Sequence, residues 1–316
     1  MPERRVPIAP QQVDAPLTSA AVFLVVTVRD DALAAARAVL AGIDDLVASV
    51  GFRHLDGRLS CTVGIGSRVW EPLTGSAPPA ELHPFVEMAG ATHTAASTPG
   101  DLLFHIRAER QDLCFELERL VLEQLGDAVH VEDEVAGFRY FDARDLLGFV
   151  DGSANPVGPA LPEATLVGAE DSAVAGGSYV VVQKYLHDLS AWQRLSTEEQ
   201  ERIIGHRKAD NVELDDAPEG SQQAHKSLAT ITDAQGEHDI LRDNMPFGSP
   251  AAGEFGTYFI GYSRRLWVIE KMLERMFIGD PPGLHDRLLD FSTARTGTTF
   301  FAPSATFLSG LDEDAG

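Results

Sequence analysis

The chain has 316 residues, of which 44% are hydrophobic, and its 48 acidic and 25 basic residues give a formal net charge of -23 at pH 7. This length is enough for two hydrophobic cores, because single domains usually contain about 100 to 200 residues. The negative charge repels phosphate backbones and anionic lipid headgroups, so we expect no nucleic-acid partner and no membrane partner.

The N-terminus and the cysteines indicate the compartment. Pro, Gln and Asp follow the basic pair Arg4 and Arg5, where a signal peptide would need an apolar core, and the first apolar run, residues 21–28, is too short to span a bilayer. We therefore expect a soluble, cytoplasmic protein. Cys61 and Cys114 lie far apart without CxxC spacing, which favours two buried free thiols over a disulfide or a thiolate metal site.

The first half shows the order β-α-β-β-α-β. Residues 21–28 (AVFLVVTV) are rich in β-branched side chains and predict a strand, and apolar residues at steps of three and four predict a helix over 30–50. Further patterns predict strands over 59–65 and 101–108, a helix over 111–125 and a last strand over 135–141. This order is typical of ferredoxin-like domains, in which an antiparallel sheet packs two helices on one face.

The second half repeats the pattern. We predict a strand over 178–185, a helical stretch over 197–205, a strand over 255–262 and a helix over 266–277. The strand and helix of residues 101–127 parallel those of 256–280, which indicates a duplication, although two helices could obey the same patterning independently. The predicted fold class is therefore α+β, with two ferredoxin-like domains over residues 1–145 and 146–316.

Two irregular stretches indicate where a functional site is expected, and the lack of common motifs argues against several classes of enzyme. Residues 148–177 are rich in Gly and Pro and predict a long loop, and residues 208–223 form an acidic stretch just before His225; long loops of this kind are usually functional. No HExxH spacing supports a zinc hydrolase, no GxGxxG or GxxxxGK[ST] supports a nucleotide site, and no GxSxG marks a serine hydrolase.

The stretch GFVDGSANP, residues 148–156, predicts a turn, because Asp-Gly and Asn-Pro are common turn formers. Phe149 and Val150 beside Asp151 would hold its carboxylate at the edge of an apolar pocket, where it can act as an acid or a base. Three motifs then resemble the dye-decolorising peroxidase family: GFVDG with the Ser-Ala-Asn-Pro continuation of bacterial B-type members, His225 in QAHKSL, and Arg242 with Asn244 in LRDNMPFG. The resemblance covers the chain apart from residues 1–15 and the acidic end, residues 311–316.

The resemblance implies a peroxidase that depends on one haem b per chain, bound in the C-terminal half. Such an enzyme uses hydrogen peroxide to form a ferryl iron and a porphyrin radical, and then oxidises dyes, phenols or other small aromatic donors one electron at a time. By the same resemblance, His225 is the axial ligand of the haem iron. An axial histidine donates its other ring nitrogen to a carboxylate or carbonyl. Asp286 and Asp290, expected one helical turn apart, are the candidates; we favour Asp286 without a physical reason to exclude Asp290.

The resemblance places Asp151, Arg242 and Asn244 on the opposite haem face. Asp151 would transfer the peroxide proton, and Asn244 would hydrogen-bond peroxide or a water. Arg242 stays charged at ordinary pH, contacts the haem site and stabilises developing negative charge, so we expect it to contribute more than Asp151. Electrons from large donors could pass through aromatic side chains, most of which we expect in the core: Trp70, Trp192, Trp267, Tyr185, Tyr258 and Tyr262.

Two alternatives remain open at this point. The first is a haem carrier or iron-releasing protein on the same fold, and the second is a haem-free regulatory or assembly module, since one fold hosts many functions. The expected partners are hydrogen peroxide, small-molecule reductants and, by analogy with the family, further copies of the chain. The resemblance also allows an encapsulin shell as a partner, but the tail, residues 309–316, does not support it because it offers no apolar docking segment.

Overall fold

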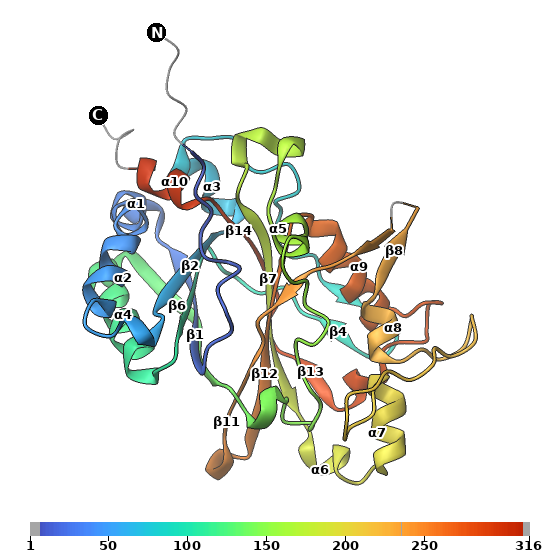
Figure 1. Cartoon of the computed structure of the whole chain (residues 1–316). Helices are drawn as coiled ribbons and strands as arrows, with labels where there is room; N and C mark the ends of the chain where they lie inside the picture. Colours follow the sequence, from blue (N-terminus) through green and yellow to red (C-terminus); the bar gives the residue numbers. More distant parts are fainter. Residues whose placement is uncertain (1–6, 235, 312–316) are drawn as a thin grey trace.

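The computed structural model describes residues 7–234 and 236–311, and its N-terminal half is one ferredoxin-like unit (Figure 1). Its antiparallel strands lie in the order β2 (Ser60–Ile65), β5 (Leu102–Ala108), β1 (Ala20–Val28) and β6 (Val129–Phe138). The helices α1 (Leu33–Ala41), α2 (Ile43–Gly51) and α4 (Gln111–Leu125) pack on one face of these strands. Alternate β1 residues, Val22, Leu24 and Val26, are buried in the core on that face.

The C-terminal half has the same strand order. The strands β10 (Leu241–Arg242) and β11 (Met245–Ser249) pair with β12 (Glu254–Ser263), which pairs with β7 (Ser178–His187) and, through β7, reaches β14 (Thr298–Ala302). The helix α9 (Leu266–Phe277) follows β12 as α4 follows β5. The residues that precede the two helices share one backbone conformation, with φ -132° and ψ 127° at Arg110 and φ -131° and ψ 122° at Arg265. The predicted pair of ferredoxin-like units is confirmed.

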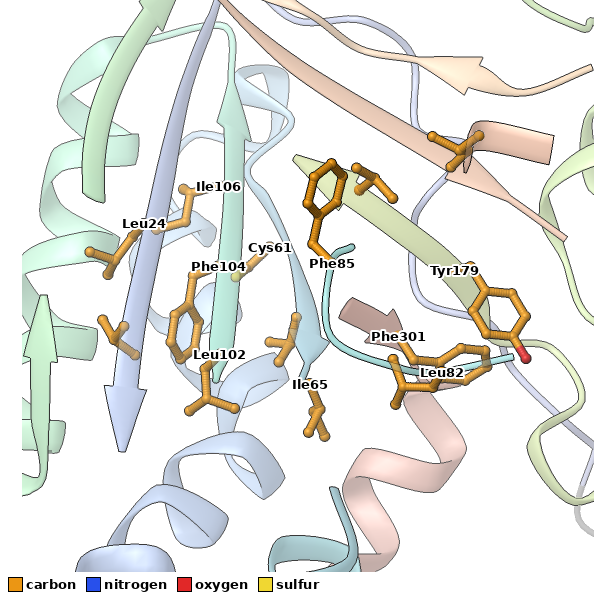
Figure 2. Close-up of a cluster of buried hydrophobic side chains, with 14 of the residues drawn as sticks. Leu24, Cys61, Ile65, Leu82, Phe85, Leu102, Phe104, Ile106, Tyr179 and Phe301 are labelled. Carbon is orange, nitrogen blue, oxygen red and sulfur yellow. The ribbon is translucent and has the colours of Figure 1, made fainter. Parts of the chain in front are cut away.

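The two halves share one sheet and two cores. β14 pairs with β2 through Phe301 and Ile65, which joins the strands into a ten-stranded sheet. Figure 2 shows the core beside this junction, where Phe104 and Ile65 belong to the same cluster as Tyr179 and Phe301. A second cluster lies between the halves: the Phe23 ring on β1 stacks on the Tyr258 ring on β12 at 4.3 Å, although four strands separate them in the sheet. The sheet therefore folds back on itself.

Three predicted elements differ in the structure. The helix predicted over residues 30–50 is two helices, because the backbone leaves the helical conformation at Gly42 (φ -91°, ψ 5°). The strand predicted over 135–141 is β6, which begins at Val129; its first residues are mostly exposed and polar, so they lack an apolar pattern. The predicted loop over 148–177 contains the helix α5 (Ala160–Thr165) and a short 3-10 segment.

The remaining elements are short, and most fall below the length at which periodicity is informative. The helices are α3 (Ser67–Thr74), α6 (Leu189–Trp192), α7 (Thr197–Ile204), α8 (His225–Ala229) and α10 (Ala305–Ser309), and the strands are β3 (Met88–Ala89), β4 (Thr94–Ala95), β8 (Ile231–Asp233), β9 (Gly236–His238) and β13 (Ser292–Ala294). Cys61 and Cys114 are buried and free, as predicted. No helix within residues 7–234 and 236–311 combines the length and apolar composition needed to cross a membrane.

Candidate active site

A mostly apolar cavity of about 990 Å³, including its open mouth, lies in the C-terminal half. One wall is a face of α9, whose residues Ile269, Met272, Leu273 and Met276 recur at helical spacing. The strands β7 and β12, the loop before α5 and the segment after α9 close the other sides. An apolar lining with a few placed polar groups is typical of cofactor pockets.

His225 presents its imidazole at this cavity from the first residue of α8. Its Nδ1 lies 2.6 Å from Oδ2 of Asp286, a carboxylate that is fully buried. The other oxygen of Asp286 accepts the backbone N–H of Leu288 at 2.9 Å, so both carboxylate oxygens have partners. This arrangement holds the ring by Nδ1 and leaves Nε2 for a ligand in the cavity.

The structure separates the two aspartates that the sequence left as alternatives. They do not share a helix face, because Asp286 precedes and caps the short 3-10 helix Arg287–Asp290. The Asp290 carboxylate instead lies 3.0 Å from Nε2 of His93 and 2.9 Å from Nε2 of His285. The prediction of one helical turn was therefore wrong, and Asp286 is the carboxylate beside His225.

Asp151, Arg242 and Asn244 line the same cavity as His225. The turn predicted for GFVDG is present, and both of its glycines have a left-handed backbone, with φ 96° at Gly148 and φ 77° at Gly152. Asn244 donates from Nδ2 to Oδ2 of Asp151 at 3.1 Å and accepts the N–H of Ile260 at 3.2 Å. The structure thus brings all the predicted site residues except Asp286 to the wall of one cavity, and Asp286 lies directly behind His225.

Arg242 is fixed by its backbone while its side chain keeps a free donor. The Asn155 side chain donates to the Arg242 carbonyl at 2.7 Å and accepts its N–H at 3.0 Å. The Arg242 Nε is buried and has no hydrogen-bond partner among the residues that the structure describes. A buried cationic donor without a partner suits an anionic group in the cavity, such as a carboxylate of a cofactor or a peroxide oxygen.

Two residues near Arg242 escaped the sequence analysis. Asn155 belongs to the Ser-Ala-Asn-Pro continuation, which was noted as a motif without a physical role. Asp243 lies between Arg242 and Asn244, and its buried carboxylate is 3.3 Å from Arg107 and 3.5 Å from Arg139, both from the N-terminal half. No local pattern could have paired Asp243 with Arg107 or Arg139, because each of them lies more than a hundred positions away.

Burial changes the protonation of other groups at the cavity. It raises the pKa of Asp145 to about 6, and the neighbouring Asp151 charge adds to this effect. It lowers the pKa of His187 to about 4, so this imidazole is neutral near pH 7. Of the aromatic residues considered for electron transfer, Trp70, Trp192, Tyr185, Tyr258 and Tyr262 are buried in the core, as expected for most of them, whereas Trp267 is 38% exposed.

Both halves of the chain match models of one family. Residues 10–139 match the N-terminal model of Dyp-type peroxidases, and residues 142–307 match the C-terminal model. The chain belongs to the Dyp-type peroxidase family. The match begins before residue 15, where the resemblance was expected to start, and Gln11 is accordingly buried, donating to the Val63 carbonyl at 2.8 Å.

The sequences and structures of several known proteins align with nearly the whole chain. A dye-decolorizing peroxidase of Mycobacterium tuberculosis is 55% identical over 95% of this chain and 90% of its own length. The solved DyPB from Rhodococcus jostii RHA1 is 56% identical with a TM-score of 0.92, over 96% of this chain and 98% of that one, and a variant of it is described in complex with heme. The encapsulated DyP-type peroxidase from Mycobacterium smegmatis is 53% identical with a TM-score of 0.93, over 96% and 98%.

These likenesses decide between the alternatives left open by the sequence. The chain is a dye-decolorising-type peroxidase, an oxidoreductase that acts on peroxide. A deferrochelatase of Escherichia coli, which would represent the iron-releasing alternative, is 27% identical over 66% of this chain. The chain is therefore much more similar to the peroxidases than to that protein.

Proposed function

We propose that His225 would bind the iron of a haem b held in the cavity, that Arg242 and Asp151 would act on hydrogen peroxide there, and that Asn244 would orient the Asp151 carboxylate. Haem is the cofactor of this peroxidase, and when bound it supplies the redox chemistry for peroxide reduction and for one-electron oxidation of small aromatic donors. The observation that carries the proposal is the 2.6 Å contact between Nδ1 of His225 and the buried Asp286 carboxylate at the cavity wall.

The contact with Asp286 sets the tautomer of His225. The imidazole Nδ1–H donates to the carboxylate, so the lone pair stays on Nε2, which is the atom a metal needs. The negative charge of Asp286 also makes the ring more electron-rich. Since Asp286 has no exposure to solvent and both of its oxygens are engaged, the ring is held in one orientation.

Arg242 acts through its charge. An arginine side chain carries a positive charge, and Arg242 lines the same cavity as Asp151. A fixed cationic donor there stabilises the negative charge that develops as the bond between the peroxide oxygens breaks. The removal of one such donor elsewhere costs roughly 3 to 4 kcal/mol.

Asp151 moves the proton. Its carboxylate accepts a proton from one oxygen of hydrogen peroxide and returns it to the departing hydroxide, which leaves as water. Asn244 was predicted to bind peroxide or a water, but its amide already contacts Asp151 and the N–H of Ile260. We therefore assign Asn244 the orientation of the Asp151 carboxylate.

The test is the absorption spectrum of the purified haem-loaded protein before and after one equivalent of hydrogen peroxide. His225→Ala should lose most haem, and Arg242→Ala should keep haem but react with peroxide about 100- to 1,000-fold more slowly. His130→Ala, which alters an exposed histidine of β6, is the matched control and should behave as the wild type. A wild-type haem spectrum in His225→Ala would exclude His225 as the ligand.

The assembly and location remain proposals with separate tests. We propose a cytoplasmic homo-oligomer with domains over residues 1–145 and 146–316, to be tested by sedimentation of the purified peroxidase and by limited proteolysis near residue 145. The relative from Mycobacterium smegmatis is an encapsulated enzyme. The tail that bears on such a shell is residues 309–316, of which residues 312–316 lie outside the described residues.

A further inference from the structure

Two histidines and an aspartate converge beside the haem cavity but outside it. His93 lies between β3 and β4 in the N-terminal half, whereas His285 and Asp290 come from the segment after α9. Their ligand atoms all lie within 4.8 Å of one another, with Nε2 of His93 at 3.0 Å and Nε2 of His285 at 2.9 Å from the same Asp290 oxygen. The peroxidase mechanism uses none of these three side chains.

We propose that His93, His285 and Asp290 form a binding site for one divalent d-block metal ion of the zinc type. Four-coordinate zinc, with bonds of about 2.0 to 2.1 Å to nitrogen and oxygen, requires ligand atoms roughly 3.3 Å apart. The contacts of 2.9 and 3.0 Å to Asp290 therefore need to widen by only a few tenths of an ångström. Partly exposed side chains can make that adjustment by small rotations.

The ligand types select the class of ion. Two imidazoles and one carboxylate suit zinc and its neighbours in the first transition row, whereas magnesium and calcium prefer all-oxygen sites. Three protein ligands leave a fourth position for water. The side chains are 23% exposed at His93, 19% at His285 and 34% at Asp290, so an ion can reach them without an opening of the fold. The net charge of -23 also attracts cations.

The competing arrangement is a hydrogen-bonded cluster that needs no metal. In it the Asp290 carboxylate accepts both imidazole N–H groups, and Arg287 adds a cationic neighbour with Nε 3.6 Å from the other Asp290 oxygen. The two arrangements predict different affinities for zinc. An ion at this site would replace the two hydrogen bonds by three coordinate bonds, and the exposed Arg287 side chain can turn toward solvent.

The proposed site is separate from the haem ligand. Asp286 follows His285 directly, but its carboxylate contacts His225 and the N–H of Leu288 and takes no part in the cluster. Because His93 belongs to the N-terminal half and the other ligands to the C-terminal half, the ion would link the two halves. Metal binding should therefore raise the thermal stability of the folded protein.

Isothermal titration with ZnCl₂ of haem-loaded protein, freed of metal by a chelator, tests the proposal. The bound haem keeps His225 from binding zinc. We expect one zinc ion per chain in the wild type and an affinity at least about tenfold lower in His93→Ala and Asp290→Asn, since a ligand should matter no less than its supporting contacts. His130→Ala has the same composition as His93→Ala and should bind zinc as the wild type does.

A second measurement, thermal unfolding with and without zinc, distinguishes the loss of a metal ligand from a folding defect. The melting temperature should rise with zinc in the wild type and in His130→Ala, but not in His93→Ala or in the milder variant His93→Gln, and the haem spectrum should be the same in all of them. The proposal is overturned if the wild type binds no stoichiometric zinc. It is also overturned if the His93 variants bind zinc as tightly as His130→Ala.

Discussion

The substitution Asp286→Asn tests the tautomer argument most directly. Asparagine has the same shape but replaces one carboxylate oxygen by an NH₂ donor. If the amide oxygen keeps the Leu288 N–H, the NH₂ group faces His225 and forces its Nδ1 to accept, which places the ring proton on Nε2. If the amide is reversed, two donors meet at Leu288 instead. Either orientation conflicts with a contact that the structure shows.

The expected change in the rate of haem loss follows from the hydrogen bond that Asp286→Asn removes. A hydrogen bond to a charged group contributes about 1.5 to 3 kcal/mol, and loss of the partner behind a ligating histidine typically lowers metal affinity by about 10- to 100-fold. A tenfold change corresponds to about 1.4 kcal/mol, so the two estimates agree. We therefore expect Asp286→Asn to lose haem about 10- to 100-fold faster than the wild type.

The assay is haem transfer to an excess of apomyoglobin, followed by absorbance. Asp290→Asn is the matched control, because Asp290 contacts His93 and His285 but not His225, and without added zinc it should lose haem at the wild-type rate. Equal rates for the wild type and Asp286→Asn would refute the reasoning. A faster haem loss from Asp290→Asn than from Asp286→Asn would show that Asp290, and not Asp286, supports His225.

Three further predictions concern Asn155, Asp243 and Asp145. Asn155→Ala removes both hydrogen bonds to the Arg242 backbone, so we expect a loss of about 1 to 3 kcal/mol in the free energy of unfolding and a slower reaction with peroxide by stopped flow; an unchanged rate would show that Arg242 needs no such support. Asp243→Asn leaves Arg107 and Arg139 without their buried counter-charge and should cost about 3 kcal/mol in urea unfolding, whereas a loss below about 1 kcal/mol would contradict the buried pairing. Burial raises the pKa of Asp145 to about 6, so its contribution to stability is fully present below its unfolded pKa of about 4 and is lost as pH rises through about 6. The melting temperature of the wild type should therefore fall relative to that of Asp145→Asn as pH rises over this range. A constant difference between the two melting temperatures would be evidence against the raised pKa.

Local patterns were sufficient for the long elements. The bounds predicted for α4 and α9 agree with the structure, because the period of an amphipathic helix is recorded within a few turns of sequence. The exposed start of β6 and the short strand β14 were missed. β14 is held by pairing with β7 and β2, which lie far away in the chain. A strand of that length carries too few residues for a period to be recognised.

The site shows the same division. The sequence by itself determined the family and the cofactor class, and it predicted His225, Asp151, Arg242 and Asn244 as site residues, because these predictions depend on residue identity and motif order. The tertiary structure decided which carboxylate lies behind His225, since Asp286 and Asp290 have similar sequence contexts and only the fold buries Asp286 beside His225 and places Asp290 beside His93 and His285. It also decided that Asn155 and the N-terminal half fix Arg242 and its neighbours, and that His93 meets His285. Such contacts join residues whose separation along the chain leaves no local pattern, so only the packing of the two halves brings them together.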